Sequence, residues 1–565
     1  RGCDPSEVHE LSRLTNAILA QAEELELVSD HCRVLVDVDA KVELIVAALD
    51  ELSETLIPDG LHIVGAELSR DARTSYLSAI SSSMEDAAIS EKALSLITHG
   101  HGAEKAARVD GVEKTDAGLG SYKKLEEIDK SLDGRIETKS LIRALDGCFI
   151  PPVVGGDIVR TPEILPTGRN IHGFDPFRLP SGFAMSEGAA QANKLIARYI
   201  DDNGDMPSSV ALVLWGTDNM KTEGVPVALA LALMGAKPRV DSFNKIVGAV
   251  LVPLSELGRP RIDVVMTMSG IFRDLLPMQM RMLAEAAYLA ASAEDEPIEQ
   301  NSIRRNVLAR EEADGCDFET AALRVFSNAD GAYGANLNHM VENGAWDQES
   351  ELGDLFVNRK SFAFDHHGDI QHSSAALKAS LRTVDAAYQN LDGLETGITT
   401  LDQYFDSLGG IARATAAEVG SDIPVYIGDQ NQKEGKVRSL NEQVALETRT
   451  RALNPAWFEG MLKHGYEGVR QIEAHVTNTM GWSATTGQVD PWIYRELTET
   501  YMLDPEMRSR LAELNSKASA AVANRLLEAH ERKYWQPDDE MLDALRSVSE
   551  ELEDRLEGVE GDIAA

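Results

Sequence analysis

The chain has 565 residues, a length that suggests about three to five domains rather than one ordinary core. Hydrophobic residues make up 43% and charged residues 26%, so most of the chain can bury a core and is not disordered. The formal net charge of −39 would repel nucleic acid and excludes a phosphate-binding role for the surface as a whole. No run approaches 18 uninterrupted apolar residues, so we expect no transmembrane segment.

The four cysteines, Cys3, Cys32, Cys148 and Cys316, lie far apart and form no CxxC pair. This spacing indicates neither a zinc cluster nor a disulfide framework and fits a reducing compartment. We therefore expect a cytoplasmic location, or the stroma if the source has plastids. Association with the periphery of a membrane stays open.

Taken in chain order, residues 1–65 predict a helical segment of a larger upstream domain, and residues 66–150 a charged helical region. Many Pro and Gly residues follow up to residue 180, which predict an ordered, irregular loop and a domain boundary. Residues 151–330 predict an α/β domain, and residues 331–565 a helix-rich domain with cavity-lining residues. The predicted fold class is thus multidomain α/β, with a parallel-type region between helix-rich N-terminal and C-terminal parts.

The central α/β signature starts at Val210–Leu214, a continuous apolar run typical of a buried parallel strand. An Ala/Leu-rich helix is predicted from about Val225 to Met234, and strand-length runs follow at Ile246–Val252 and Ile262–Met266. Ligands of open parallel sheets bind outside the carboxyl ends of the strands. The loops 215–224 and 267–274 are therefore expected at the ligand-binding edge.

A second candidate region starts at Asn454-Pro455, a typical helix start. If one helix continues to residue 481, a rotation of about 100° per residue gathers several polar side chains into one stripe. Its members are His464, Glu467, Gln471, His475 and Asn478. His and Glu suit proton transfer and metal binding, so the stripe predicts a cavity-lining row. The alternative is the plain boundary of an amphipathic helix, with Gly465 and Gly468 breaking its phase.

A further helix is predicted at Val437–Leu453, where Arg438/Glu442 and Glu447/Arg451 are spaced as solvent-exposed i,i+4 pairs. Arg449 and Arg451 could instead hold the carboxylates of an anionic ligand. Asp406 is either a turn acid or a functional carboxylate.

Three other features are weaker. His366 and His367 could bind a metal, but adjacent side chains rarely point together. Arg169 and His172 lie in the Pro/Gly-rich loop, where functional side chains concentrate but arginine also braces carbonyl groups. The pattern GxxxxGK[ST] does not occur, so we expect no ATP hydrolysis by this chain itself.

Several blocks of sequence together resemble one family, the large (H) subunit of magnesium chelatase and the related large subunit of cobaltochelatase. The blocks are Pro166–His172, Leu214–Thr217, Ala228–Pro238, Leu257–Asp263, Ser269–Asp274, Gly331–Gly334, Leu453–Trp457 and Lys463–Gly468. Three more favour the magnesium branch: Gln389–Leu391, Asp402–Gly410 and Thr477–Gly487. Members of the family are longer and carry a His-Gly-x-Leu-Glu motif that this chain lacks. The chain thus resembles the C-terminal part of the large subunit, and we expect it to be inactive in isolation.

The resemblance implies insertion of Mg²⁺, the substrate metal, into protoporphyrin IX for (bacterio)chlorophyll biosynthesis. It also implies that ATP is hydrolysed by separate AAA+ partner subunits of the I and D types. Mg²⁺ prefers oxygen ligands, so Asp406 and Glu467 would deliver the metal and accept pyrrole protons, with His464 or His475 as relay. The residues expected to contact the porphyrin are Arg169, His172, Arg449, Arg451, Trp457 and Trp482.

Two alternatives remain open. One is insertion of cobalt into a corrinoid. The other is a non-catalytic porphyrin-binding or scaffold protein, including one half of a split subunit whose partner is the missing N-terminal half.

Overall fold

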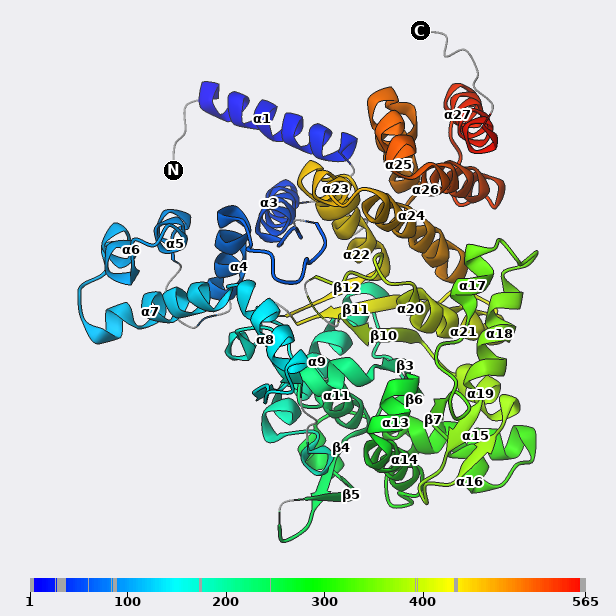
Figure 1. Cartoon of the computed structure of the whole chain (residues 1–565). Coiled ribbons are helices and arrows are strands. Elements are labelled where there is room, and N and C mark those ends of the chain that lie inside the picture. Colours follow the sequence, from blue (N-terminus) through cyan, green and yellow to red (C-terminus); the bar gives the residue numbers. More distant parts are fainter. Residues whose placement is uncertain are drawn as a thin grey trace.

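The computed structural model describes residues 5–25, 27, 37–58, 60–82, 84, 89–171, 175–243, 245–391, 393, 395–430 and 435–558 (Figure 1). Cys3, Cys32 and His172 lie outside the described residues. Cys148 and Cys316 are free thiols, as the cysteine spacing predicts. Among the described residues, every helix is too short or too polar to cross a lipid bilayer.

An eight-stranded sheet forms the centre of the molecule, with the strand order β12-β11-β10-β3-β6-β7-β8-β9. Neighbours from β11 through β7 pair in parallel, whereas β12, β8 and β9 pair antiparallel at the two edges. The strands are β3 (Ser209–Leu214), β6 (Asp263–Met268), β7 (Val325–Ser327), β8 (Phe362–Phe364), β9 (Ile370–His372), β10 (Ala386–Asn390), β11 (Val425–Asp429) and β12 (Lys436–Ser439). The predicted fold class is confirmed.

Both faces of this sheet are covered, because alternate strand residues point into two separate cores. Along β3, Ala211 and Val213 enter one core, and Val210, Leu212 and Leu214 enter the other. The second core is completed by α9 (Gly182–Asn203), α11 (Val225–Met234), α14 (Pro277–Ala291) and α15 (Ser302–Asp314). The first core is completed by α18 (Ser350–Lys360), α19 (Ser374–Leu381), α21 (Gly410–Val419) and the C-terminal helices.

The C-terminal helices include π-helical turns and extend the first core outward. They are α22 (Leu440–Glu447), η5 (Thr448–Ala452), α23 (Pro455–Leu462), α24 (Tyr466–Thr486), α25 (Pro491–Thr498), η6 (Glu499–Leu503), α26 (Pro505–Glu531) and α27 (Asp539–Glu557). Another π-helical turn, η4 (Phe405–Gly409), follows α20 (Asp402–Tyr404).

Shorter elements connect these layers. They are α10 (Gly216–Lys221), α12 (Leu254–Leu257), α13 (Gly270–Leu275), η3 (Ile298–Gln300), α16 (Phe318–Ala321) and α17 (Leu337–Glu342). The strands β4 (Ala236–Val240) and β5 (Ile246–Leu251) form a separate antiparallel hairpin that projects from the body (Figure 1). The run at Ile246–Val252 is therefore a strand, as expected, but it lies outside the central sheet.

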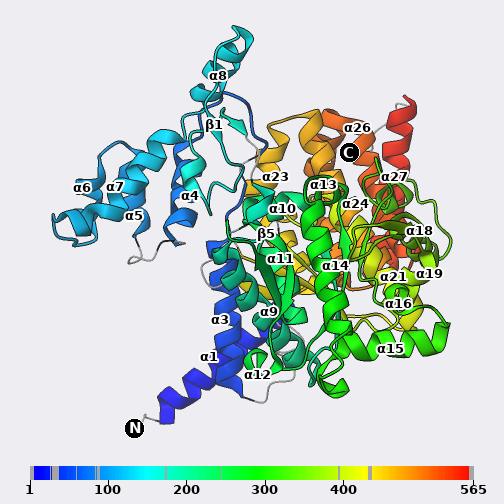
Figure 2. The ribbon, with the colours of Figure 1, turned by 90° about the horizontal axis from the view of Figure 1, so that it is seen from below.

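The N-terminal helices form an arm beside the sheet (Figures 1 and 2). They are α1 (Pro5–Glu24), α3 (Val38–Glu54), α4 (Arg70–Ser82), α5 (Glu91–Thr98), α6 (Ala103–Val109), α7 (Asp116–Ser131) and α8 (Arg135–Leu145). The Pro/Gly-rich passage that follows is irregular, as predicted. Its only described elements are β1 (Pro152–Val153), η1 (Pro162–Ile164), β2 (Asn170–Ile171) and η2 (Pro176–Arg178).

The sheet contains strands from both sides of residue 330, because β8 to β12 follow that residue in sequence. The boundary placed there from the sequence stays a prediction about domain organisation. One expected helix is shorter than predicted: Val437–Ser439 belong to β12, and the helix begins at Leu440. Ser439 and Glu442 form a capping box at that point, which fixes the start of α22.

Candidate active site at the carboxyl edge of the sheet

The carboxyl ends of β3, β6 and β7 lie side by side, since these strands pair in parallel and in register. Trp215 follows β3, Ser269 follows β6, and Asn328 follows β7. The two loops expected at this edge, 215–224 and 267–274, consist mostly of the short helices α10 and α13. The two segments are in contact, since the Ser269 hydroxyl accepts a hydrogen bond from the Gly216 amide at 3.2 Å. This edge therefore gathers polar groups from several segments, as the strand pattern predicts.

Asp406 lies at this edge and is buried. Its two carboxylate oxygens accept from the backbone amides of Ala335 (2.6 Å) and Leu337 (2.7 Å). Burial raises the pKa of Asp406, while the amides and the charge of Lys360 act in the opposite direction. In this structure Asp406 thus holds the end of the loop after β7 and the first residue of α17.

Lys360, the last residue of α18, is a buried cation at the same edge. Its Nζ donates to the Asn328 side-chain oxygen at 2.8 Å and to the carbonyl of Met268, the last residue of β6, at 3.0 Å. Burial lowers the pKa of Lys360 to about 8, and Asp406 opposes this shift. A lysine with such a pKa can exchange protons near neutral pH. The sequence analysis missed Lys360 because nothing in its local pattern distinguishes it from a solvent-exposed lysine at a helix end.

An open hollow of about 200 Å³ lies beside the sheet, between the segment Arg273–Arg281 and the loop that joins β8 to β9. Arg273, Asp274, Arg281, Asp330 and Asp365 line it together with Pro277, Met280, Phe364, Gly368 and Ile370. Arg273 donates to the carbonyls of Asn328 and Ala332 at 3.2 Å each, so it braces the loop after β7.

A second group of buried ionisable side chains surrounds His475 of α24. Burial lowers the pKa of His475 to about 4, so its imidazole is neutral near pH 7. Both of its ring nitrogens are buried and make no hydrogen bond within the described structure. The charged groups acting on it are Glu447, which opposes the shift, and Arg451, which adds to it.

Glu447 and Arg451 are both buried, which corrects their interpretation as a solvent-exposed pair. The Glu447 carboxylate accepts from the amides of Ile398 (2.8 Å) and Thr399 (2.9 Å), and Arg451 donates to the carbonyl of Glu395 at 2.9 Å. The spacing did suggest that these two residues lie near each other. It could not show that the segment 395–399 packs over them.

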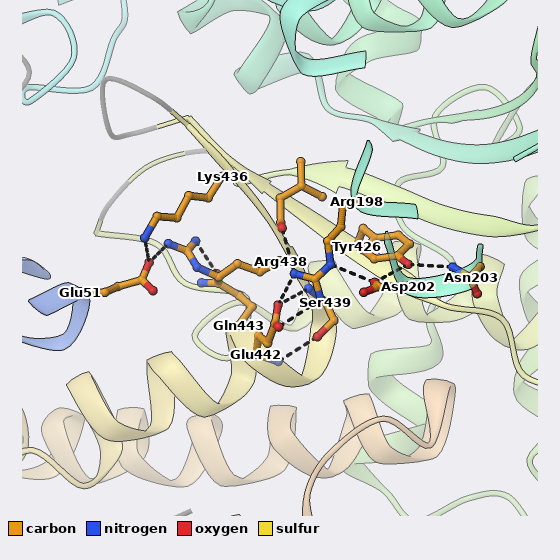
Figure 3. A network of polar contacts seen from close by, with 11 residues as sticks. Glu51, Arg198, Asp202, Asn203, Tyr426, Lys436, Arg438, Ser439, Glu442 and Gln443 are labelled. Atoms are coloured by element: carbon orange, nitrogen blue, oxygen red, sulfur yellow. Dashed lines mark hydrogen bonds and ion pairs between the residues drawn. The ribbon is translucent and has the colours of Figure 1, made fainter. Parts of the chain in front are cut away.

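The prediction that Arg438 and Glu442 form a solvent-exposed pair is also wrong, because each residue has another partner (Figure 3). Glu442 receives two hydrogen bonds from Arg198, at 2.9 and 3.0 Å. Arg438 is buried between Asp429, at 2.8 Å, and Glu51 of α3. Figure 3 shows that Lys436 also reaches Glu51, so the edge strand β12 connects the N-terminal arm to the sheet.

The expected polar stripe begins only at Glu467, because the helix breaks between α23 and α24. Gly465, whose positive φ of 58° favours glycine, separates the two helices. Gly468 then permits a close crossing, since a Cβ there would overlap the Met461 carbonyl. His464 lies outside both helices, where its Nε2 accepts from the Leu61 amide at 2.8 Å. His464 is thus separated from the other members of the stripe, whereas Glu467, Gln471, His475 and Asn478 follow one another on α24 at the expected spacing. Asn454 caps α23 as predicted.

Glu467 is partly exposed at the start of α24. Hydrogen bonds from Arg470 and Gln471 lower its pKa to about 2. Asn478, another member of the expected stripe, is buried and donates to the Thr399 carbonyl at 2.9 Å.

The expected porphyrin contacts are spread over several parts of the molecule. Arg169 donates to the carbonyls of Ile164 (2.6 Å), Leu165 (3.0 Å) and Pro166 (3.2 Å), so here it braces the loop. Arg449 lies over the Trp492 ring at 4.1 Å and donates to the Leu25 carbonyl. Trp457 and Trp482 are fully buried, and Trp482 donates to the Ile398 carbonyl at 2.9 Å. Contact of either indole with a macrocycle requires the surrounding helices to separate.

This arrangement, a covered parallel sheet with buried ionisable groups beyond its carboxyl edge, matches a known class of protein. The chain belongs to the CobN/magnesium chelatase family, whose model matches residues 3–542. It is 54% identical to the magnesium-chelatase H subunit of Rhodobacter capsulatus over 510 residues, or 90% of this chain and 39% of that protein. It is 58% identical to the magnesium-chelatase H subunit of Cereibacter sphaeroides over 439 residues, or 78% of this chain and 36% of that protein.

The fold is shared with a solved relative, the catalytic subunit of cobaltochelatase from Mycobacterium tuberculosis. The two structures superpose with a TM-score of 0.87 at 30% sequence identity, over 96% of this chain and 50% of that one. The chain therefore spans about two-fifths of the length of the two curated relatives and half of the solved chain.

Proposed function

We propose that this chain is part of the porphyrin-binding large subunit of a magnesium chelatase, an enzyme that forms nitrogen–metal bonds by inserting Mg²⁺ into protoporphyrin IX. The observation that carries the proposal is the difference in identity between the two branches of the family. Identity is 54% and 58% to two magnesium-chelatase H subunits, but 34% to the aerobic cobaltochelatase subunit CobN of a Sinorhizobium species. The proposal includes AAA+ partner subunits of the I and D types that hydrolyse ATP, and a cytoplasmic or stromal location.

Glu467 is the side chain best suited to meet the incoming metal. It is accessible, and its low pKa keeps it a carboxylate at neutral pH, which suits a hard cation such as Mg²⁺. The same low pKa makes it a weak proton acceptor. We therefore assign Glu467 to metal delivery and the acceptance of pyrrole protons to groups with higher pKa values.

Asp406 and His475 are the buried candidates for proton transfer, and Asp406 is also a candidate metal ligand. Asp406 becomes accessible only if the loop between β7 and α17 and the start of α17 release it, since Ala335 and Leu337 bind its two oxygens. His464 is partly exposed and is the remaining candidate for relaying protons. Arg169, His172, Arg449 and Arg451 are the proposed partners of the porphyrin carboxylates, with Trp457 and Trp482 beside the macrocycle.

The decisive experiment reconstitutes the full-length protein that contains this chain with its AAA+ partners, ATP and protoporphyrin IX. Mg²⁺ and Co²⁺ are supplied in separate reactions, and absorption and fluorescence spectra report the metallated tetrapyrrole. We expect ATP-dependent formation of Mg-protoporphyrin. Activity only with Co²⁺ and a corrinoid substrate would move the chain to the cobalt branch, and porphyrin binding without insertion by any complex would favour a scaffold.

A further inference from the structure

A separate group of metal-ligating side chains lies at the amino edge of the sheet. It consists of Glu319 on α16 and His366 and His367 in the loop that joins β8 to β9. Phe364, the last residue of β8, pairs with Val325, the first residue of β7, so this loop lies beside the amino end of β7. The group is therefore separated from Asp406 and Lys360, which lie beyond the carboxyl ends of the parallel strands.

The loop is held in one conformation by a single carboxylate. One oxygen of Asp365 accepts from the amides of His367 (2.9 Å), Gly368 (2.8 Å) and Asp369 (2.8 Å). Gly368 adopts a φ of 93°, which a residue with a side chain would adopt only under strain. The loop backbone is thus fixed before any ligand binds.

This loop directs two adjacent histidines to the same side, which is unusual for neighbours in sequence. The His366 ring stacks on Tyr288 of α14 at 3.8 Å and 11°, and the His367 ring lies 3.9 Å from the His366 ring. Arg281, also on α14, donates to the His366 carbonyl at 3.4 Å. The position of His366 is consequently determined from both its ring and its backbone.

Glu319 completes the group from a different element. One ligand atom from each of the three side chains lies within 4.8 Å of the others. In a tetrahedral site, bonds of about 2.0–2.2 Å from a metal to nitrogen or oxygen place two ligand atoms about 3.4 Å apart, so closure requires a movement of roughly 1–1.5 Å. Glu319 is exposed and can supply that movement by rotating its side chain. In the described part of the chain, its carboxylate and the imidazole nitrogens of His366 and His367 form neither hydrogen bonds nor ion pairs.

We propose that Glu319, His366 and His367 bind a divalent transition-metal ion of the Zn²⁺ type. Two imidazoles and one carboxylate are ligands that suit Zn²⁺, Co²⁺ or Ni²⁺, whereas Mg²⁺ prefers oxygen ligands and retains its waters. Three protein ligands leave one position of a tetrahedron for water or another donor. The ion would connect α16 to the β8–β9 hairpin at the edge of the sheet, and it is distinct from the Mg²⁺ that we propose as substrate.

The test uses the untagged chain, stripped of metal with a chelator and titrated with Co²⁺ alone. Co²⁺ bound by nitrogen and oxygen ligands in a four- or five-coordinate site gives intense visible absorption bands, which hexa-aqua Co²⁺ lacks. We expect one equivalent to bind with such bands, Zn²⁺ to displace it, and a large excess of Mg²⁺ to leave it in place. Zn²⁺ should also raise the Tm of the chain.

The variants are His366→Ala, His367→Ala and Glu319→Gln, with His339→Ala as the matched control. His339 is an exposed histidine on α17 whose ring lies 3.8 Å from Glu342 and outside the group. We expect each of the three variants to bind Co²⁺ at least about tenfold more weakly, because even outer partners of metal ligands contribute about 10–100-fold. The control should bind normally.

We expect Glu319→Gln to fold normally, since it replaces an exposed side chain with one of the same shape. Circular dichroism of all four proteins without metal checks their folding. Equal Co²⁺ affinity in the three variants and the control would overturn the proposal, as would displacement by Mg²⁺ or the absence of the visible bands. In those cases the two histidines only stack on Tyr288.

Discussion

The N-terminal arm (residues 5–171) and the body (residues 175–558) are stabilised in different ways. Most of the arm packs around one small apolar core of its own, formed mainly by α4 to α7. The body packs around two large cores on opposite faces of the sheet, and it buries charged side chains such as Arg324, Asp263 and Lys360. Figures 1 and 2 both show α5 to α7 away from the sheet.

Among the described residues, the contacts between the two regions are largely polar. They include Glu51 with Arg438, the Leu61 amide with His464, and the Leu25 carbonyl with Arg449. Ile57 and Leu61 add apolar contact with the core of the body. The difference indicates that the arm can change its position at a modest cost in free energy. Removing the partner of a buried charge in the body, by contrast, costs a large amount of free energy.

The largest expected effect is loss of a buried ion pair in the body. Asp263 accepts from Arg324 at 2.8 and 3.0 Å and from Asn306 at 2.9 Å, and both charged side chains are almost completely buried. Asp263→Ala should lower the free energy of unfolding by about 3–5 kcal/mol, because Arg324 remains buried without its counter-charge. Urea denaturation measures the loss. A change below about 1 kcal/mol would show that the body does not depend on its buried charges.

The next effect concerns pH and His475. The folded chain holds the imidazole neutral, with a pKa of about 4, while the unfolded chain takes up a proton near the ordinary value of 6.5. Its contribution to stability is therefore complete above pH 6.5 and is lost as the pH falls toward 4, at up to about 1.4 kcal/mol per pH unit, or roughly 3 kcal/mol in all. His475→Leu should remove this part of the pH dependence. Parallel stability curves for the wild-type chain and His475→Leu would refute the assignment.

A smaller effect is expected where the arm meets the body. Glu51 binds Lys436 at 3.0 Å and also Arg438, and these cations lower the pKa of Glu51 against the effect of its burial. Glu51→Gln should cost about 1.5–3 kcal/mol, in the range for a hydrogen bond to a charged group. Limited proteolysis should then cleave around α3 faster while the body stays intact. Glu43→Gln, an exposed change on the same helix, is the control and should leave the cleavage rate unchanged.

The smallest effect on stability is expected at Glu467. Glu467→Gln should change the free energy of unfolding by less than about 1 kcal/mol, since the side chain is partly exposed and no apolar volume is lost. In the reconstituted chelatase it should reduce insertion by at least about tenfold, since even outer partners of metal ligands contribute about 10–100-fold. Glu459→Gln, which removes a similar exposed pair with Arg510, is the matched control. Normal insertion by Glu467→Gln would transfer the proposed role to Asp406.

Much of the local structure could be predicted from the sequence. The helix Val225–Met234 has the predicted bounds, because an apolar Ala/Leu run ends at a glycine in the left-handed conformation. The strand at Val210–Leu214 and the helix start at Asn454 also follow from local pattern and capping chemistry. The family resemblance was likewise carried by contiguous blocks of residues, and it is confirmed.

Only the tertiary structure decided which charged side chains are buried and which partners they take. Glu447 and Arg451 looked like a solvent-exposed helical pair, but the segment 395–399, far away in sequence, covers them. His464 looked like the first member of a stripe with Glu467 and His475, but the turn at Gly465 separates it from α24, which carries the other two. Local patterns report the periodicity of one segment, whereas burial depends on contacts between distant segments. For that reason the sequence determined the class of this protein, and the packing determined the chemistry open to each of its ionisable groups.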